Sequence, residues 1–278
     1  MKRCTTVQEV RQSRKALGTV GFVPTMGFLH EGHLSLVKRA KAENDAVIVS
    51  IFVNPIQFGS SDDLTHYPRA LERDLSLLKD AGVDVVFTPD VETLYPQGFV
   101  TKIDLEGIAS QMEGASRPGH FSGVATVVTK LLNIVQPQHA YFGQKDAQQC
   151  AVVRRFVADL NIPTEIVVVP TGREADGLAC SSRNVRLTPE ERQKAPALYK
   201  ALQKAQSLFK TGERSCRVLE KAMRDVLHQH GLTRIDYAVV VDPEQFTPIK
   251  EASEKALALL AVQIGDVRLI DNIALDQA

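Results

Sequence analysis

The stretch Gly21-Phe-Val-Pro-Thr-Met-Gly-Phe-Leu-His-Glu-Gly-His33 reads as an apolar strand, a glycine-marked turn and then two histidines three residues apart. Three residues is close to one helical turn, so a helix that begins near Glu31 would point His30 and His33 the same way. Both side chains would then lie beside the free backbone N–H groups of a helix N-terminus, which bind phosphate. The stretch therefore predicts a strand-turn-helix unit that handles a nucleotide. Two solvated histidines in an ordinary turn are the alternative.

The histidine spacing differs from that of a zinc metalloprotease helix. That motif needs histidines at i and i+4 in a continuous helix, whereas His30 and His33 are three apart with Gly32 between them. A structural zinc site needs four Cys or His ligands. The four cysteines are isolated in the sequence and form no Cys-x-x-Cys pair: Cys4, Cys150, Cys180 and Cys216. We therefore expect no metal bound tightly by the protein itself.

The bulk composition indicates a protein that binds small molecules and is located in a reducing compartment. The chain has 278 residues, enough for two domains, and its 33 Lys plus Arg balance its 33 Asp plus Glu. No net field then favours nucleic acid or an anionic membrane, so partners should be small molecules or further copies of the chain. The first residues contain no apolar signal-peptide core and no run approaches a membrane span. Unclustered cysteines suit a cytoplasmic location better than a disulfide framework.

Short β-branched or aromatic runs alternate with amphipathic segments over the first part of the chain. The expected strands are residues 19–23, 46–53, 83–87 and 165–169. The expected helices are residues 34–43, 69–80, 124–135 and 147–160. This alternation predicts an α/β fold with a parallel sheet covered on both faces. Ligands of such sheets bind at the carboxyl ends of strands, so we expect chemistry in the polar turns after residues 20–24 and 48–54.

The pattern changes after Asn184. Thr188-Pro-Glu-Glu191 has the form of a helix start, with Thr188 as N-cap and Pro at the first helical position. Two charged helical patterns follow up to His230, and residues 235–241, 256–262 and 267–270 read as strands. We place a domain boundary near residue 175, which gives a parallel-sheet domain over residues 1–175 and a smaller α+β domain over residues 176–278.

Two polar clusters in the first domain suit recognition of a small substrate. Phe52-Val-Asn-Pro-Ile-Gln-Phe-Gly59 places the amides of Asn54 and Gln57 in a turn, and amides both donate and accept, as a hydroxylated substrate requires. A turn merely capped by Asn54 is the alternative. Arg117-Pro-Gly-His-Phe-Ser-Gly123 precedes a helix that Ser122 is expected to cap, while Arg117 neutralises an anion; a plain loop is the alternative.

Two further clusters carry groups suited to phosphate. In Tyr141-Phe-Gly-Gln-Lys-Asp-Ala-Gln-Gln149, Lys145 offers a point charge, Asp146 an acceptor for a sugar hydroxyl or for Mg²⁺, and Gln149 an amide. A salt-bridged surface helix start is the alternative. Gly172-Arg-Glu-Ala-Asp-Gly-Leu-Ala-Cys-Ser-Ser-Arg-Asn184 sets two serines beside an arginine, which is a cradle for phosphate unless the segment is a mobile linker.

Taken in order, these motifs resemble those of the pantothenate synthetase (pantoate-beta-alanine ligase) family over essentially the whole chain. The blocks that carry the resemblance are Pro24-Thr-Met-Gly27, His30-Glu-Gly-His33, Phe52-Val-Asn-Pro-x-Gln-Phe58, Arg117-Pro-x-His-Phe121, Phe142-Gly-x-Lys-Asp146 and Arg173-Glu-x-Asp-Gly-Leu-Ala-x-Ser-Ser-Arg-Asn184. The His-x-Gly-His element is shared with many nucleotidyltransferases, but the later blocks narrow the resemblance to one reaction.

The resemblance implies ATP-dependent amide formation in which pantoate is adenylated and beta-alanine then displaces AMP. Its implied ATP-binding residues are Pro24, Thr25, Met26, Gly27, His30, His33, Gly143, Gln144, Lys145, Asp146, Gly172, Cys180, Ser181, Ser182 and Arg183. Its implied catalytic residues among them are His33, His30, Lys145 and Arg183; the family gives the position of His33 a proton-donor role, which we interpret as charge stabilisation. Its implied pantoate-binding residues are Met26, Asn54, Gln57, Arg117 and Gln149, with Gln57 also near beta-alanine. It further implies Mg²⁺ with the ATP, a Rossmann-like N-terminal domain, a smaller C-terminal domain that closes over the nucleotide, and a homodimer.

Three positions depart from the family pattern. The family usually has Glu, Val and Met where this chain has Gln144, Gly172 and Cys180. By this resemblance, Gln144 removes a negative charge beside the phosphates, and Gly172 deletes a side chain that is expected to flank adenine. These changes bear on nucleotide affinity rather than on the residues expected to act on phosphate.

Two rival functions explain fewer of the motifs. Another adenylyl transferase of the same superfamily would account for the histidine pair but not for Gln57, Gln149 or the Ser-Ser-Arg block. A catalytically silent nucleotide-binding module would have no need for all the phosphate-directed side chains together.

Overall fold

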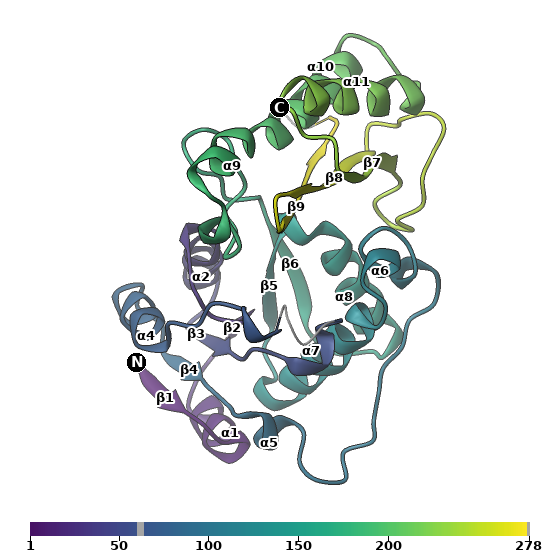
Figure 1. The fold of residues 1–278 in the computed structure, drawn as a ribbon. Helices are drawn as coiled ribbons and strands as arrows, with labels where there is room; N and C mark the ends of the chain where they lie inside the picture. The colour runs from purple at the N-terminus through teal and green to yellow at the C-terminus, as the bar shows by residue number, and fades with distance from the viewer. Residues whose placement is uncertain (60–63, 277–278) are drawn as a thin grey trace. The chain divides into compact units, whose positions relative to one another are not determined.

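The computed structural model describes residues 1–59 and 64–276, and these form two compact units (Figure 1). The first unit consists of Met1–Gly143 and Gln148–Pro170, and the second of Gln144–Ala147 together with the chain from Thr171 onward. The short segment Gln144–Ala147 therefore belongs to the second unit, although it lies in the sequence between two elements of the first.

The first unit is built on a six-stranded parallel sheet. Its strands are β1 (Lys2–Cys4), β2 (Val20–Thr25), β3 (Ala46–Ile51), β4 (Val85–Phe87), β5 (His139–Gly143) and β6 (Glu165–Val169). The strand order is β1-β4-β3-β2-β5-β6, and every neighbouring pair is parallel. The chain thus moves from β2 toward one edge and later returns to the other side of β2, so the topological switch point lies between β2 and β5.

The strands β2 and β5 separate toward their carboxyl ends. Their pairing is confined to Gly21 with His139 and Phe22 with Ala140, whereas β2 stays paired with β3 as far as Thr25. Pro24 has no N–H to donate to a ladder, and it lies beyond the part of β2 that pairs with β5. The opening of the sheet at the switch point is therefore compatible with a proline inside a central strand.

Helices cover both faces of this sheet. The longer ones are α1 (Val7–Lys15), α2 (Glu31–Glu43), α4 (Leu71–Asp80), α7 (His120–Val135) and α8 (Ala147–Asp159). Shorter turns are η1 (Pro55–Gln57), α5 (Val91–Leu94), η2 (Gly107–Ala109), α6 (Glu113–Ser116) and η3 (Gln144–Asp146). Figure 1 shows α2 and α4 on one side of the sheet and α1 and α7 on the other. The α2 side chains Leu36 and Val37 pack with Val47 and Val49 of β3 in one buried cluster.

The expected elements of this unit agree with the structure to within a few residues, but the expected set leaves out β1 and α1. The sequence does not predict β1, because Lys2-Arg-Cys4 is a polar edge strand with no apolar run. The expectation that Ser122 caps the helix of residues 124–135 is wrong. The helix begins at His120 with Gly119 as N-cap (φ +80°), and Ser122 lies inside it, where its hydroxyl donates to the Ile103 carbonyl at 2.9 Å.

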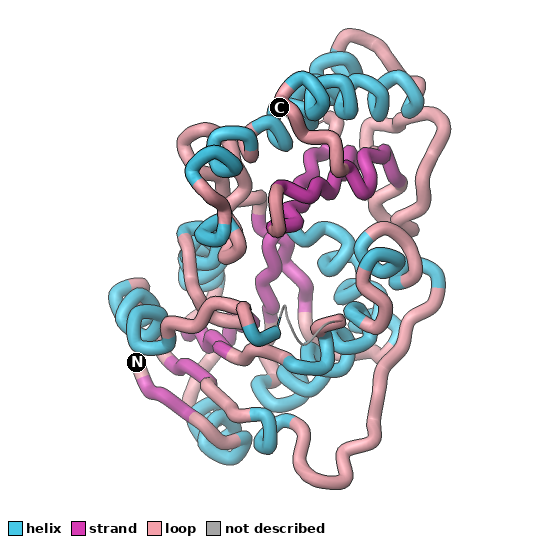
Figure 2. The backbone as a smooth tube through the Cα atoms, viewed as in Figure 1, coloured by secondary structure: helices cyan, strands magenta, loops and turns pink. Residues whose placement is uncertain are grey.

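The second unit is the predicted α+β assembly. Helices α9 (Pro189–Lys194), α10 (Ala197–Lys210) and α11 (Cys216–Gln229) follow the turn η4 (Asn184–Arg186). Strands β7 (Ile235–Val241), β8 (Leu257–Ile264) and β9 (Val267–Ala274) form an antiparallel sheet in that order. Figure 2 shows these strands in magenta beside the helices, and buried residues of α10, α11 and β8 form one core.

The predicted start of α9 is confirmed. The Thr188 hydroxyl accepts from the Glu191 N–H at 3.3 Å, and the Glu191 carboxylate accepts from the Thr188 N–H at 2.8 Å, so the two residues form a capping box. Among the helices in the described ranges, none combines the length and apolar character needed to cross a membrane.

Candidate functional site

A buried carboxylate holds the turn that follows β2. Gly27 (φ +84°) and Phe28 (φ +50°) both adopt left-handed backbone conformations, which are uncommon for a residue as bulky as phenylalanine. Asp74 of α4 is 1% exposed, and its two oxygens accept the backbone N–H groups of Phe28 at 2.7 Å and Leu29 at 2.8 Å. These charge-assisted bonds favour the unusual turn and set the direction in which α2 begins. The sequence signal for Asp74 was an acidic residue on the apolar face of an amphipathic helix.

The two histidines face the same way, as their spacing predicts. Helix α2 begins at Glu31 with His30 at the N-cap position, and the ring centroids of His30 and His33 are 4.1 Å apart. The backbone N–H of His30 donates to Nδ1 of His33 at 3.4 Å. Because Nδ1 accepts in this contact, the neutral His33 ring carries its proton on Nε2. The turn therefore presents imidazole groups beside the N-terminus of a helix, an arrangement suited to an anion.

The turn after β3 brings two predicted substrate-binding residues to the turn after β2. Asn54 and Gln57 are 1% and 6% exposed. The Asn54 side-chain amide donates to Oε1 of Gln57 at 2.9 Å and to the Gly123 carbonyl at 3.1 Å, while Nε2 of Gln57 contacts the sulfur of Met26 at 3.2 Å. Asn54 makes no side-chain cap bond to η1. Its side chain thus orders Gln57, and the alternative of a simple capped turn does not describe it.

Arg117 reaches the same turn through His120. Nη1 of Arg117 lies 3.1 Å from Nε2 of His120, and Nδ1 of His120 lies 2.9 Å from the Gln57 carbonyl. A guanidinium only donates, so Nε2 accepts and the neutral ring donates from Nδ1 to the carbonyl. His120 is 7% exposed, and this chain of contacts ties the backbone of Gln57 to the loop that precedes α7.

The first turn of α8 contains a buried glutamine that orders a loop. Gln148 is 5% exposed; its oxygen accepts from the Glu113 N–H at 3.0 Å, and its amide nitrogen donates to the carbonyls of Ile108 at 2.8 Å and Gln111 at 2.9 Å. Gln148 therefore fixes the loop of residues 108–113. The predicted substrate residue Gln149 follows it on α8 and is partly exposed. Sequence reasoning missed Gln148, since two adjacent glutamines carry no signal that separates their roles.

In the second unit, Asn272 of β9 holds the segment that contains Lys145. Its amide nitrogen donates to the carbonyls of Gln144 and Lys145, both at 2.9 Å, and its oxygen accepts from the Gln144 side chain at 3.1 Å. Asn272 is 3% exposed. Nζ of Lys145 lies 3.3 Å from the Asp146 carboxylate, which is 47% exposed at the side chain. A polar clamp thus fixes the backbone that carries this pair, in which the Lys145 side chain is 17% exposed; the salt bridge itself is consistent with the salt-bridged helix start that the sequence left open.

A buried ion pair supports this clamp. The Arg173 guanidinium donates to both oxygens of Asp271 at 2.7 and 3.0 Å and stacks on the Tyr199 ring at 3.8 Å. Burial raises the pKa of the Asp271 carboxyl, against the opposite effect of Arg173. Asp271 precedes Asn272 in β9, so the ion pair and the clamp belong to one network.

Residues 172–184 form a hydrogen-bonded turn rather than the linker that the sequence left open. The Cys180 N–H donates to the Gly172 carbonyl at 2.9 Å, so two of the three residues that depart from the family pattern are direct backbone partners. The Asn184 amide donates to Glu174 at 2.8 Å, and the Arg183 N–H donates to the Ser181 hydroxyl at 3.2 Å. The hydrogen-bonded turn therefore includes Ser181, Ser182 and Arg183.

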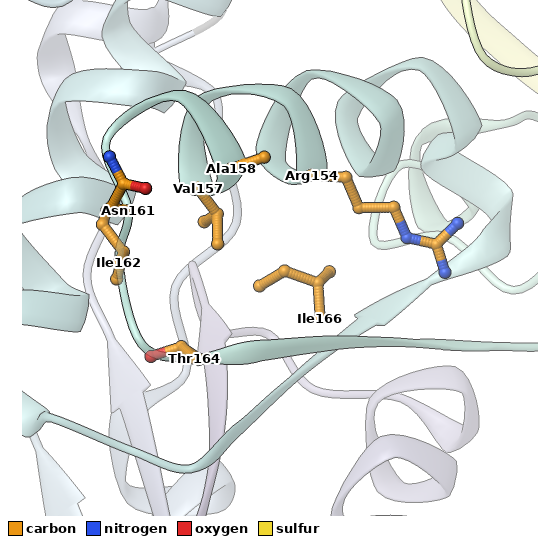
Figure 3. A pocket seen from close by; sticks show the side chains of 7 residues that line it. All are labelled: Arg154, Val157, Ala158, Asn161, Ile162, Thr164 and Ile166. Atoms are coloured by element: carbon orange, nitrogen blue, oxygen red, sulfur yellow. The ribbon is translucent and has the colours of Figure 1, made fainter.

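A separate hollow lies between α8 and the edge strand β6. Figure 3 shows that Val157 of α8 and Ile166 of β6 face the same open space, with Arg154 at its margin. None of the residues predicted to bind substrate lines this hollow. Within the described part of the chain, no group of three or more His, Cys, Asp or Glu side chains is arranged to hold a metal ion.

Known proteins match this chain over nearly its full length. The family model for pantoate-beta-alanine ligase matches residues 1–274. Pantothenate synthetase of Gluconobacter oxydans is 66% identical over 270 residues, which cover 97% of this chain and 98% of that protein. The pantothenate synthetase of Roseiflexus sp. is 58% identical over 99% of this chain and 100% of that protein.

Solved structures show the same similarity. The crystal structure of pantothenate synthetase from Thermus thermophilus has a TM-score of 0.95 at 50% identity and covers 100% of both chains. The pantoate-beta-alanine ligase from Francisella tularensis, complexed with beta-gamma ATP and beta-alanine, has a TM-score of 0.84 at 38% identity, with 100% and 99% of the two chains covered.

Proposed function

Because this chain belongs to the pantoate-beta-alanine ligase family, we propose that it joins pantoate to beta-alanine through a pantoyl adenylate. A pantoate carboxylate oxygen attacks the α-phosphorus of ATP, and the bond from that phosphorus to pyrophosphate breaks. The beta-alanine amine then attacks the acyl carbon, the bond to AMP breaks and the amine loses a proton. Adenylation is required because a carboxylate is a poor acyl donor, whereas an acyl phosphate carries a good leaving group.

The observation that carries this proposal is the pairing of two kinds of group in the first unit. The imidazoles of His30 and His33 lie at the N-terminus of α2, and the Gln57 amide contacts Met26 in the turn just before that helix. Phosphate suits the first group, and a hydroxylated carboxylate suits the second. We assign ATP to Pro24, Thr25, Gly27 and the histidines, with His33 donating from Nε2 to charge that develops on the α-phosphate.

The substrate roles follow from the contacts around Gln57. Its side-chain amide and that of Gln149 bind the pantoate hydroxyls and carboxylate, with Met26 and Asn54 beside them and Arg117 supplying positive charge. Gln57 also lies near the beta-alanine amine when that substrate arrives.

Further nucleotide contacts are assigned in this proposal to residues 143–146 and 172–183. Lys145, Ser181, Ser182 and Arg183 bind the triphosphate, and Gly143, Gln144 and Asp146 bind the ribose and phosphates. Cys180 belongs with these triphosphate ligands, and Gly172 flanks adenine. At both positions this chain has a smaller side chain than the family usually has, and the Cys180 N–H donates to the Gly172 carbonyl.

Mg²⁺ fits this proposal as a complex with ATP. The ion prefers near-octahedral oxygen ligands, keeps several waters and binds through one or two carboxylates together with substrate phosphates. Asp146 is a half-exposed carboxylate beside Lys145, so its chemistry matches that requirement. When bound, the ion neutralises phosphate charge.

We also expect a homodimer in the cytoplasm, and light scattering of the purified protein tests the oligomeric state.

The deciding experiment is exchange of labelled pyrophosphate into ATP with pantoate present and beta-alanine absent. We expect exchange, and we expect His33→Ala to lower its rate by about a hundredfold, the scale of losing one charge-stabilising donor. The control is His228→Ala, because His228 is exposed on α11 in the other unit. Exchange that requires beta-alanine would contradict the adenylate, and exchange with other carboxylates but not with pantoate would favour another adenylyl transferase.

A further inference from the structure

The orientation of the Gln57 amide is set by its neighbours rather than by its substrate. The Gly123 carbonyl only accepts hydrogen bonds, so the Asn54 group 3.1 Å from it is the amide nitrogen. That nitrogen has a second hydrogen, which it donates at 2.9 Å to Gln57, so the Gln57 atom that receives it is the oxygen. The Gln57 amide nitrogen then points the other way, toward the sulfur of Met26 at 3.2 Å.

Asn54 needs a donor for its own oxygen, and Tyr95 provides it. The Tyr95 hydroxyl donates to Oδ1 of Asn54 at 2.8 Å. With this bond, both amide hydrogens and the oxygen of the 1% exposed Asn54 are partnered. Without this bond, the buried Asn54 side-chain oxygen would have no donor. The Asn54 amide would then be held less firmly, because one of its hydrogen bonds would be missing.

The Tyr95 ring is itself fixed by aromatic packing. It contacts Phe52 and Phe99 with ring centroids 6.1 and 5.1 Å away, and Nζ of Lys130 lies 4.4 Å from the Phe99 centroid and 5.8 Å from that of Tyr95. Burial raises the pKa of the Tyr95 hydroxyl well above its usual value, so the hydroxyl stays protonated and remains a donor. Rigid placement and a permanent proton are what an orienting donor requires.

The geometry points to Tyr95 as a positioning residue for substrate recognition: acting through Asn54, it holds Gln57 so that the amide N–H, and not the carbonyl, faces the ligand. This inference rests on the proposed function, in which Gln57 binds pantoate. It specifies the chemistry of that contact, because a group that presents only N–H selects an oxygen acceptor such as a carboxylate or a hydroxyl lone pair. Tyr95 lies outside the set of residues that sequence motifs identify.

Tyr95→Phe tests the inference because it keeps the ring and removes only the hydroxyl. We expect the KM for pantoate to rise about fivefold, the scale of one net hydrogen bond, while the KM for ATP stays at its wild-type value. The matched control is Tyr141→Phe. The buried Tyr141 hydroxyl also bonds an asparagine, accepting from Asn44 at 2.7 Å, and it donates to Glu43 at 2.9 Å. This control also loses a tyrosine hydroxyl that bonds an asparagine, and it should leave both KM values unchanged.

A double-mutant cycle separates this inference from the proposed function. Gln57→Leu should raise the KM for pantoate, and adding Tyr95→Phe to it should have no further effect, because the two residues act on one contact. If Gln57→Leu leaves the KM for pantoate unchanged, the proposed role of Gln57 fails and this inference with it. If Gln57→Leu raises that KM but Tyr95→Phe alone does not, or if the two effects multiply, the inference about Tyr95 is overturned while the proposed function stands.

A second variant covers the case in which Tyr95→Phe does not accumulate as folded protein. Asn54→Asp cannot donate to Gln57, so Gln57 must turn its nitrogen toward the new carboxylate and its carbonyl toward the ligand. We expect a loss of pantoate affinity larger than that of Tyr95→Phe, again without a change in the KM for ATP. Wild-type pantoate affinity in Asn54→Asp would overturn the inference.

Discussion

For the variant Gly123→Ala, local helix propensity and tertiary packing predict opposite changes in stability. Gly123 lies inside α7, where alanine is preferred to glycine by about 1 kcal/mol, so the helix alone predicts a stabilised protein. The packing predicts the opposite. A Cβ at this position would lie 2.6 Å from Cα of Gln57 and from the Ile56 carbonyl oxygen, and 2.7 Å from the Gln57 nitrogen. These atoms are backbone of η1, which has no flexible side chain to move aside.

The size of the effect follows from these distances. Ordinary contact begins near 3.4 Å, so η1 and α7 must separate by the difference between 3.4 and 2.6 Å, or ~0.8 Å. Overpacking of this kind costs about 1–3 kcal/mol, and three contacts with backbone atoms belong to the upper part of that range, above the gain of about 1 kcal/mol in helix propensity. Displacement of a binding group by roughly 1 Å can cost up to about a hundredfold in rate, so we expect the KM for pantoate to rise by at least about tenfold.

The assay combines steady-state kinetics with thermal unfolding. Gly123→Ala should raise the KM for pantoate more than the KM for ATP and lower the unfolding midpoint by several degrees, since about 1 kcal/mol corresponds to roughly 2–4 °C in a protein of this size. The control is Gly59→Ala, because a Cβ at Gly59 meets no atom within 4 Å. A Gly123→Ala protein with wild-type pantoate KM and an unchanged or higher midpoint would refute the claim that close packing of α7 on η1 places Gln57.

Three further outcomes follow from the network in the second unit and from the cysteine pattern. Asn272→Ala removes the side chain that holds the Lys145 segment, and it should slow pyrophosphate exchange by about tenfold, as expected when a residue that positions another is lost. An unchanged exchange rate would show that the segment holds its position without Asn272. Asp271→Ala leaves the Arg173 guanidinium without its carboxylate, and it should lower the free energy of unfolding, measured in urea, by about 3 kcal/mol. Loss of an exposed ion pair costs less than about 1 kcal/mol, so a decrease as small as that would argue against a buried ion pair. Elemental analysis should find no stoichiometric zinc, and one tightly held equivalent needed for activity would contradict the expectation drawn from isolated cysteines.

The sequence by itself determined the elements whose signals are local. Residues 165–169 and 235–241 are strands with the predicted bounds, because apolar runs between turn residues are typical of buried strands. Thr188 caps α9 because the capping box involves residues only three apart. The facing of His30 and His33 follows from helix geometry alone, once α2 begins at Glu31. Each of these outcomes depends on neighbours within one helical turn or one strand.

Only the tertiary structure decided which residues orient the candidate site. Asp74 reaches a turn 46 positions earlier in the chain, Tyr95 reaches Asn54 across 41 positions, and Asn272 reaches Gln144 across 128. Ser122 shows the converse, since its hydroxyl resembles a helix cap in sequence but bonds the carbonyl of Ile103, 19 positions away. These bonds join side chains to partners that strand order and helix packing bring together. Local patterns of polarity and spacing specify elements but not those juxtapositions, so the orienting residues become visible only when the chain is folded.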